Sequence, residues 1–216
     1  MKAVVVAHGD VFAEDRSVLA GADLIVAADG GAMALERWGV VPQVLVGDMD
    51  SVGVERANAL AKSGVRVIRM PREKDESDLE LAVGHAIGAG ADEITLLGLF
   101  GGARLDYTIA NALLLADARY RGRVMRAVTG PARLRALHVG ETALLTGAVG
   151  ELVTLLPVGA DAEGIRTVGL RYALRGEALR LGRSRGVSNV IAALPASVTL
   201  DAGALLIIET ASAATR

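Results

Sequence analysis

The sequence predicts a doubly wound α/β domain followed by an all-β domain. In the first half of the chain, short apolar runs alternate with segments of helical period, which is the pattern of a mainly parallel sheet with helices on both faces. From about Val124 onward, short strands are separated by turns that contain glycine, which indicates antiparallel pairing. We place the boundary near this change, with an N-terminal domain of residues 1–125 and a C-terminal domain of residues 126–216.

The predicted strands of the first half are nearly continuous runs of apolar residues. Runs of this kind are typical of strands that are buried on both faces of a parallel sheet. They cover residues 3–7, 24–28, 44–47, 65–68 and 94–98. Ligands bind at the carboxyl ends of the strands in such folds, so the loops after these runs are candidate site elements.

Two further segments have the apolar spacing of an amphipathic helix. The first stripe consists of Leu79, Ala82, Val83, Ala86 and Ile87. The second consists of Leu105, Thr108, Ile109, Ala112, Leu113 and Ala116. We expect two helices, each with an apolar stripe that faces the sheet.

In the second half, the clearest pattern is a predicted hairpin. Apolar and polar residues alternate over 170–174 and again over 178–181, and residues 175–177 form the turn between them. The last residues, 211–216, are expected to fray. Further strands are expected at residues 152–156, 198–200 and 205–208.

The composition favours an enzyme that binds neither nucleic acid nor a membrane. A chain of 216 residues with 52% hydrophobic residues can build a sizeable core. Its formal net charge of −2 provides no long-range attraction to nucleic acid or to an anionic membrane. The absence of cysteine excludes disulfides and thiolate metal sites. The opening apolar run is too short for a signal peptide or a membrane span, so we expect a cytoplasmic protein.

Two aspartates follow the third predicted strand, in the segment Gly47-Asp48-Met49-Asp50-Ser51. Residues two apart on an extended chain point to the same side, so Asp48 and Asp50 can chelate one cation. The same segment also fits an ordinary turn in which an aspartate accepts a backbone hydrogen bond. Taken alone, the segment leaves both interpretations open.

A second acidic segment, Lys74-Asp75-Glu76-Ser77-Asp78, precedes the first predicted helix. Asp75 and Asp78 lie three residues apart and therefore close together around the first turn. An acidic N-cap at Asp75 would explain both carboxylates, because negative charge at a helix N-terminus is favourable. The positive charge of Lys74 is unfavourable near a helix N-terminus. Its position is easier to explain if a phosphate lies between Lys74 and the helix N-terminus.

Glycine-containing segments follow two other strands. In the segment 101–104, Gly101 and Gly102 allow backbone N–H groups to approach phosphate oxygens, and Arg104 can bind two such oxygens. In segment 29–32, Gly30 and Gly31 allow the same approach of backbone N–H groups, without an arginine. In both segments the glycines also fit tight turns that need a positive φ.

These polar loops all follow strands of one predicted sheet and should meet at one edge. At an effective dielectric near 20, two negative charges ~4 Å apart cost about 4 kcal/mol, so the gathered carboxylates require a cation. Hard oxygen ligands together with a phosphate favour Mg²⁺. The sequence contains neither GxxxxGK[ST] nor GxGxxG, which excludes a P-loop enzyme and argues against a nicotinamide-dependent oxidoreductase. We therefore predict a magnesium–nucleotide site.

In their order along the chain, these motifs resemble those of the thiamine pyrophosphokinase family. The matching segments are Asp29-Gly30-Gly31-Ala32, Gly39-Val40-Val41-Pro42, Gly47-Asp48-Met49-Asp50-Ser51, Lys74-Asp75-Glu76-Ser77-Asp78, Gly101-Gly102-Ala103-Arg104-Leu105-Asp106 with Asn111, Gly186-Val187-Ser188-Asn189 and Gly203-Ala204-Leu205-Leu206-Ile207-Ile208. The resemblance therefore extends over nearly the whole chain.

The resemblance implies transfer of the pyrophosphoryl group of Mg-ATP to the hydroxyl of thiamine, which gives thiamine diphosphate and AMP. It also implies that the α/β domain holds Mg-ATP, that an antiparallel β-sandwich domain follows, and that thiamine lies at a homodimer interface. The residues implied to hold magnesium are Asp48, Asp50, Asp75 and Asp78. The basic groups implied to neutralise charge on the transferred group and on the leaving AMP are Lys74 and Arg104. Contacts to the nucleotide or to thiamine are implied for Asp29, Gly30, Gly31, Ser51, Gly101, Gly102, Asp106, Asn111, Ser188 and Asn189, the last two from the partner subunit.

Four positions depart from the family's usual pattern. Tyr107 stands where the family usually has His, and Ala103 is an extra residue between the glycines and the arginine. Ser77 replaces a common Thr, and Gln43 replaces a frequent Asp. We expect the change at Tyr107 to matter most, because the loss of an imidazole alters nucleotide contacts or substrate choice.

Two other functions stay open at the level of the sequence. One is pyrophosphoryl transfer to a different alcohol, such as a hydroxymethylpterin, although segment 186–189 favours thiamine. The other is a non-catalytic nucleotide or metal sensor. Lys74 and Arg104 argue against a sensor, because a protein that only binds has little need of groups aimed at a leaving phosphate.

Overall fold

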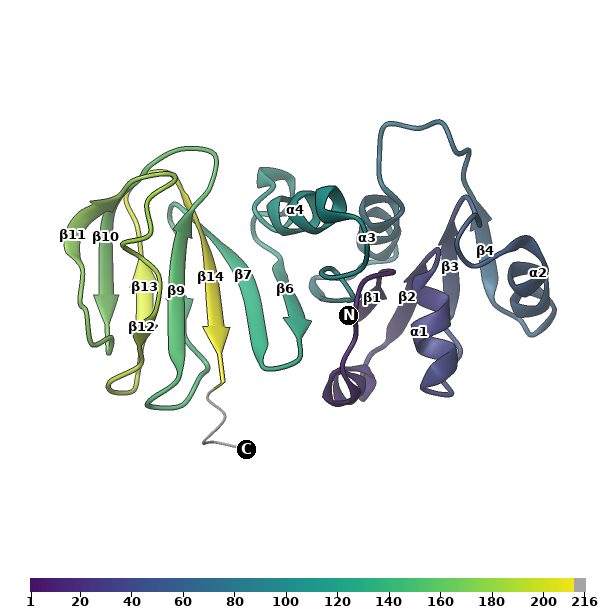
Figure 1. Cartoon of the computed structure of the whole chain (residues 1–216), viewed down its shortest axis with the longest axis horizontal. Helices are drawn as coiled ribbons and strands as arrows, with labels where there is room; N and C mark the ends of the chain where they lie inside the picture. Colours follow the sequence, from purple (N-terminus) through teal and green to yellow (C-terminus); the bar gives the residue numbers. More distant parts are fainter. Residues whose placement is uncertain (212–216) are drawn as a thin grey trace. The chain divides into compact units, whose positions relative to one another are not determined.

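A computed structural model describes residues 1–211 of the chain, which fold into two compact units. The first unit comprises Met1–Leu114 and Gly122–Gly130, and the second comprises Leu115–Arg121 and the chain from Pro131 onward (Figure 1). Most of the segment expected to fray, residues 212–216, lies outside the described residues. Within residues 1–211, no helix combines the length and apolar character that crossing a membrane requires.

The first unit contains a sheet in which all neighbouring strands run parallel, in the order β6-β5-β1-β2-β3-β4. The strands are β1 (Lys2–Val6), β2 (Leu24–Ala28), β3 (Val44–Gly47), β4 (Arg66–Arg69), β5 (Glu93–Leu97) and β6 (Val124–Thr129). The chain builds from β1 outward to β4 and then returns to the other side of β1 with β5. The reversal between β1 and β5 is the topological switch point where such sheets bind ligands.

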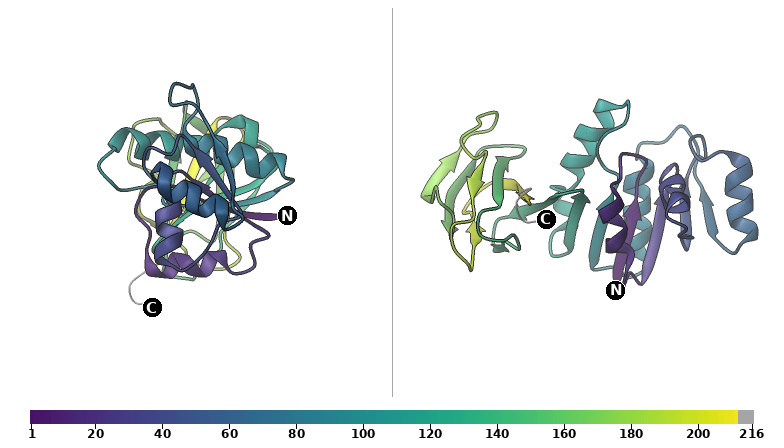
Figure 2. Two further views of the ribbon diagram at one scale, coloured as in Figure 1. Left: turned by 90° about the vertical axis from the view of Figure 1, so that its right-hand side faces the viewer. Right: turned by 60° about the horizontal axis from the view of Figure 1, so that its bottom comes forward.

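Helices alternate with these strands along the chain (Figures 1 and 2). They are α1 (Gly31–Arg37), α2 (Val54–Lys62), α3 (Asp78–Gly88) and α4 (Leu105–Leu114), with the short helix η1 (Ala13–Leu19) after β1. Val4 and Val6 share one core cluster with Leu35 of α1, while Val5, which points to the opposite face, is also fully buried. Both faces of the sheet are therefore covered, which confirms the doubly wound prediction.

Strand β4 differs from the prediction because it lies at the edge of the sheet. It begins one residue later than expected, and its four residues are partly or fully exposed rather than buried. Arg66 and Arg69 occupy its two ends, where their side chains reach water. The apolar run Val65–Ile68 therefore marks a strand but not a central one.

The predicted apolar stripe of α4 is wrong. Leu105, Ile109 and Leu113 are 51–70% exposed, whereas Asn111 and Leu115 are buried. The Asn111 side chain donates a hydrogen bond to the backbone carbonyl of Leu99 over 2.9 Å, and this polar contact decides which side of the helix faces inward. Periodicity alone located the helix but not its buried side.

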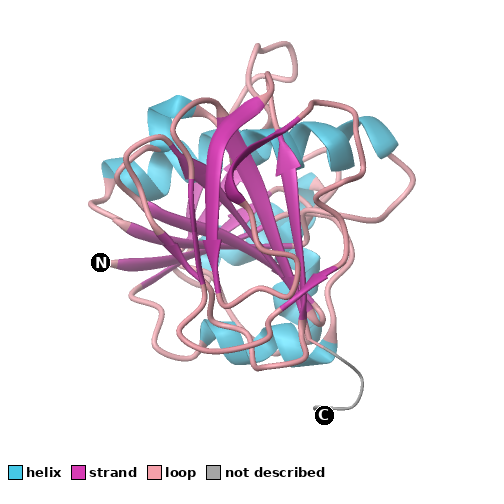
Figure 3. Cartoon of the chain, turned by 90° about the vertical axis from the view of Figure 1, so that its left-hand side faces the viewer, coloured by secondary structure: helices cyan, strands magenta, loops and turns pink. Residues whose placement is uncertain are grey.

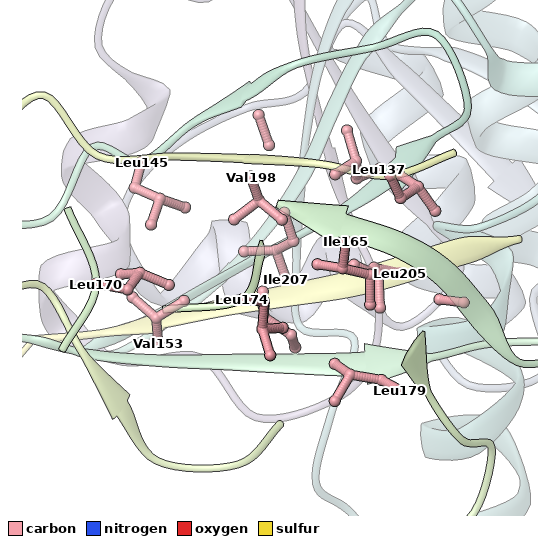
Figure 4. Close-up of a cluster of buried hydrophobic side chains, with 14 of the residues drawn as sticks. Leu137, Leu145, Val153, Ile165, Leu170, Leu174, Leu179, Val198, Leu205 and Ile207 are labelled. Carbon is pink, nitrogen blue, oxygen red and sulfur yellow. The ribbon is translucent and has the colours of Figure 1, made fainter. Parts of the chain in front are cut away.

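The second unit is built mainly from strands, which Figure 3 draws in magenta. They form two antiparallel sheets with strand orders β12-β9-β14-β7 and β11-β10-β13-β8. The elements are η2 (Ala118–Tyr120), β7 (Ala132–His138), β8 (Ala143–Leu144), β9 (Leu152–Pro157), β10 (Ala162–Val168), β11 (Arg175–Leu179), β12 (Asn189–Val190), β13 (Ser197–Thr199) and β14 (Ala204–Thr210). Both sheets contribute to one core of aliphatic side chains, including Val153, Ile165 and Leu205 (Figure 4). This arrangement confirms the β-sandwich.

The predicted hairpin over residues 170–181 is wrong. Residues 170–174 form a loop, and Arg175–Glu177 lie inside β11, which pairs with β10 rather than with the preceding segment. Leu170 and Leu174 are buried because this loop folds over the core, and its apolar alternation therefore imitates a strand.

Asp15 is a buried anchor of the first unit, and its removal is predicted to be costly. Its side chain is 1% exposed, and its two oxygens accept hydrogen bonds from the backbone N–H groups of Phe12 and Gly130, each over 2.9 Å. Asp15→Ala leaves two N–H groups without a partner, so we expect a loss of about 2–4 kcal/mol in the free energy of unfolding, measured by urea denaturation.

The matched control is Asp23→Ala, which removes an exposed carboxylate that also binds a backbone N–H, that of Lys2. Water can replace this bond, so we expect a loss below about 1 kcal/mol. Equal losses for the two variants would contradict the role assigned to Asp15.

His138 is predicted to make the stability of the protein depend on pH. Its side chain is buried at the end of β7, and burial lowers its pKa, as does Arg121, while Glu141 and Asp117 oppose the shift. The unfolded chain then binds the proton more readily, so the contribution of His138 is complete above about pH 6.5 and is lost as the pH falls below it. In urea denaturation from pH 7.5 to 5, wild type should lose stability relative to His138→Gln, and parallel curves would contradict this.

Candidate active site

Loops at the carboxyl edge of the first unit's sheet surround a cavity of about 870 Å³. They follow β1, β2, β3 and β5, and the segment between β4 and α3 joins them. The residues expected at the site that line this cavity are Asp29, Asp48, Asp50, Ser51, Lys74, Asp75, Asp78, Gly101, Gly102, Arg104 and Asn111. Four carboxylates, from Asp48, Asp50, Asp75 and Asp78, therefore face one space rather than separate regions of solvent.

Asp29, Asp48 and Asp50 form the acidic cluster of this cavity. Each offers one oxygen, and these three oxygens all lie within 4.8 Å of one another. Asp29 is buried, Asp48 is partly buried and Asp50 is exposed, so the cluster opens from the protein interior toward the cavity. Three carboxylate oxygens at this spacing are a suitable ligand set for a hard divalent cation such as Mg²⁺.

The backbone that carries Asp48 and Asp50 is a turn rather than an extended strand, which corrects the extended-chain argument. Met49 between them has φ 68° and is 2% exposed, so its buried side chain anchors a left-handed residue. The Asp48 carboxylate accepts the N–H of Asp50 over 3.0 Å. The turn and the acidic cluster, which the sequence offered as alternatives, therefore coexist.

Asp29 fixes this turn from the neighbouring strand. Its carboxylate oxygens accept the N–H groups of Ser51 and Val52 over 3.0 and 3.2 Å. Gly47 lies between the acids, and a Cβ atom there would be 2.8 Å from the Cβ of Asp29 and 3.2 Å from the Cγ of Asp78. Glycine at position 47 is therefore what allows these acids to approach one another.

Lys74 provides the positive charge inside the acidic group. Its Nζ lies 3.1 Å from Asp78 and 3.8 Å from Asp48, and its side chain is only 11% exposed. It also donates a hydrogen bond to the carbonyl of Pro71 over 3.1 Å. The ion pairs with Asp78 and Asp48 therefore explain why a lysine lies near the N-terminus of α3. From the sequence alone, we explain its position by a bound phosphate.

The N-cap of α3 is Ser77, so the alternative interpretation of Asp75 as the cap is wrong. The Ser77 hydroxyl accepts the N–H of Glu80 over 3.2 Å, and the helix begins at Asp78. Asp75 precedes the helix and lines the cavity. Its carboxylate is therefore not needed for capping.

Burial and charge shift the ionisation of this group in a consistent way. Burial raises the pKa of Asp78, and the ammonium of Lys74 only partly opposes the shift. Burial lowers the pKa of Lys74, but Asp78 and Asp48 outweigh it, so the net shift is upward. The hydroxyl of Ser51 lowers the pKa of Asp50, against a smaller opposing effect of burial. Lys74 therefore remains a cation and Asp50 an anion at neutral pH.

Arg104 lies between the glycines and α4 and is held by its neighbours. Its guanidinium makes two hydrogen bonds to Asp106, of 2.9 and 2.5 Å, and its Cζ lies 4.6 Å from the centre of the Tyr107 ring. Gly101 before it has φ +84° and passes close to the carboxylate of Asp10, so no side chain fits there. Asp106 is expected from the sequence to contact the nucleotide. In the structure, its carboxylate binds the guanidinium of Arg104.

Other predicted residues occupy supporting positions. Gly30 and Gly31 at the start of α1 lie too close to the His8 ring and to the Val6 carbonyl for any side chain. In the second unit, Asn189 is buried and its amide bonds the backbone of Tyr172 through both its oxygen and its nitrogen, over 3.0 and 2.9 Å. The contacts predicted for these residues with a nucleotide or with thiamine stay predictions.

The structure adds residues to the cavity that sequence reasoning did not single out. Arg72 lies 3.8 Å from Asp50, and Glu76 and Thr108 also line the cavity. The segment between β4 and α3 has no regular period, so no pattern marked Arg72. The signal that could have identified Arg72 is its position two residues before Lys74.

A parallel α/β sheet that gathers acidic and basic side chains in one cavity at its carboxyl edge is typical of enzymes that transfer phosphoryl groups. Comparison with known proteins narrows the class. The family model described as thiamin pyrophosphokinase, catalytic domain, matches residues 16–126, and that of the vitamin B1 binding domain matches residues 144–205. The chain belongs to the thiamin pyrophosphokinase family.

Individual relatives agree with this assignment. The chain is 24% identical over 186 residues to thiamine pyrophosphokinase of Bacillus subtilis (strain 168), which covers 86% of each chain. It is 26% identical over 210 residues to thiamine pyrophosphokinase 2 of Oryza sativa subsp. japonica, covering 85% of this chain and 77% of the relative. The crystal structure of thiamin pyrophosphokinase from Geobacillus thermodenitrificans matches with a TM-score of 0.83 and 26% identity over 99% of both chains.

Lys74→Met is predicted to destabilise the first unit by roughly 1–3 kcal/mol, because it leaves a partly buried Asp78 without its cation. Urea denaturation without divalent cations measures this loss. Adding Asp78→Asn should restore part of it, since the unpaired charge is then gone. The control Lys62→Met removes an exposed cation of α2, and an equal effect there would contradict the pairing.

Proposed function

We propose that this chain transfers the pyrophosphoryl group of Mg-ATP to the hydroxyl of thiamine, which gives thiamine diphosphate and AMP. The thiamine oxygen forms a bond to the β-phosphorus, the bond from that phosphorus to the α–β bridging oxygen breaks, and the hydroxyl proton is released. The observation that carries the proposal is the acidic cluster of Asp29, Asp48 and Asp50 beside Lys74 in one cavity.

The donor set fits a magnesium ion, because carboxylate oxygens are hard ligands and the cluster opens into the cavity. Asp48 and Asp50 would hold the ion together with Asp29, and the sequence adds Asp75 and Asp78 as further candidates. Magnesium, when bound, neutralises charge on the phosphate oxygens. Lys74 offsets part of the negative charge of the site, and its ammonium would face the transferred group.

Residues at the other wall of the cavity would hold the remaining phosphate. The backbone at Gly102 is open, since nothing lies within 4 Å of the place a Cβ atom would take, and the donors that Arg104 does not use on Asp106 can bind an oxygen of the leaving AMP. Asn111 and Ser51 line the same cavity and can hydrogen-bond to the nucleotide.

We assign Mg-ATP binding to residues 1–125 and thiamine binding to residues 126–216. The descriptions of the two matching family models, a catalytic domain and a vitamin B1 binding domain, support this division. Ser188 would face thiamine across a homodimer interface, because it is exposed, and the buried Asn189 would hold the loop beside it. Light scattering after size-exclusion chromatography tests the dimer. The B1-binding match disfavours a hydroxymethylpterin as acceptor.

The function is tested by incubating the full chain with Mg-ATP and thiamine and resolving AMP from ADP. AMP with thiamine diphosphate supports the proposal. ADP with thiamine monophosphate would show ordinary kinase chemistry, and ATP binding without product would indicate a sensor.

Asp50→Ala is predicted to lower kcat/KM at least about 100-fold. The substitution removes a carboxylate that would bind the divalent cation, and the charge of that cation would stabilise the transition state. Its melting temperature should change little, since relief of carboxylate repulsion offsets the lost bond to Ser51. Titration with Mn²⁺ should show weaker binding than in wild type. The control Glu55→Ala removes a carboxylate outside the cavity, and near-normal turnover of Asp50→Ala would exclude Asp50 as a metal ligand.

A further inference from the structure

The guanidinium of Arg104 is held on two sides by residues of its own helix start. Asp106 takes the N–H groups of Nε and Nη2, and the Tyr107 ring lies under the plane of the guanidinium at 4.6 Å. Among residues 1–211, no hydrogen-bond partner of Nη1 is found. One donor edge of Arg104 is therefore available to a ligand in the cavity that both Arg104 and Tyr107 line.

The two contacts hold Arg104 in different ways. The carboxylate of Asp106 uses two of the guanidinium's donors and neutralises its charge, whereas the ring contacts only its face and uses no donor. Arg104 is 66% exposed and its pair with Asp106 is exposed as well, so without the ring only this solvated pair limits the rotamers of the long side chain. Ordering such a side chain when a ligand binds lowers affinity, and a platform that orders it beforehand removes that cost.

We propose that Tyr107 is a positioning residue whose ring presets the Arg104 guanidinium for a phosphate oxygen of the nucleotide. The proposal rests on the proposed function only in taking ATP as the ligand. An uncharged ring suits this role, because a protonated imidazole at the same position would repel the guanidinium. Tyr107, which stands where the family usually has histidine, thereby has a role in positioning Arg104.

The test is calorimetric titration of the full chain with Mg-ATP, together with kcat and KM for ATP. Tyr107→Leu should raise the Kd and the KM for ATP about two- to fivefold, which is the range of an exposed cation–π contact. Tyr107→Phe keeps the ring and should recover most of this loss. Leucine is at least as good a helix former as tyrosine, so α4 should remain folded.

A double-mutant cycle separates positioning from a general structural effect. In the Arg104→Ala background, Tyr107→Leu should weaken ATP binding no further, because the group that the ring holds is gone. Leu113→Ala is the matched control, since it removes a side chain that is 51% exposed from the same helix but outside the cavity lining. This control should bind ATP like wild type.

Three results would overturn the proposal. They are wild-type affinity in Tyr107→Leu, an equal loss in Tyr107→Phe, which would assign the effect to the hydroxyl, and an undiminished loss in the Arg104→Ala background. If wild type binds ATP but makes no thiamine diphosphate, the proposed function fails while the titrations still decide the role of Tyr107. If wild type is active and Tyr107→Leu is unaffected, only the role of Tyr107 fails.

Discussion

Mutual repulsion among carboxylates is the constraint on which the site depends. The chain places Asp29, Asp48 and Asp50 with oxygens within 4.8 Å, and Asp78 approaches them across Gly47. Two kinds of protein group make this tolerable. Backbone N–H groups bind the Asp29 carboxylate, and the ammonium of Lys74 lies between Asp48 and Asp78. What remains is a net negative cluster open to the cavity, which is the condition for binding a divalent cation.

The topology of the sheet explains why these groups meet. Because all strands of the first unit are parallel, their carboxyl ends lie at one edge, and the reversal between β1 and β5 separates the loops on either side. The acidic cluster comes from the loops after β2 and β3, and the glycines with Arg104 come from the loop after β5. One wall therefore carries the acidic cluster with Lys74, and the other carries the glycines with Arg104.

The second unit is held together differently. Its two sheets share a core of aliphatic side chains, and its loops are fixed by buried polar side chains rather than by helices (Figure 4). Asn189 illustrates this, since its amide satisfies both the N–H and the carbonyl of Tyr172 and so holds the loop 170–174. Ser188 beside it has φ 60° and remains exposed. A fixed loop next to an exposed polar residue suits a binding surface.

Sequence by itself determined the fold class, the order of the motifs and most of the charged residues of the cavity, because apolar period and polar loops after strands are local properties. Tertiary structure decided the rest. It turned Leu105, Ile109 and Leu113 outward, placed the hairpin partner of β11 in β10, and made Asp29 a member of the acidic cluster. These outcomes depend on contacts between residues distant in the chain, such as that of Asn111 with Leu99, and no local pattern encodes them.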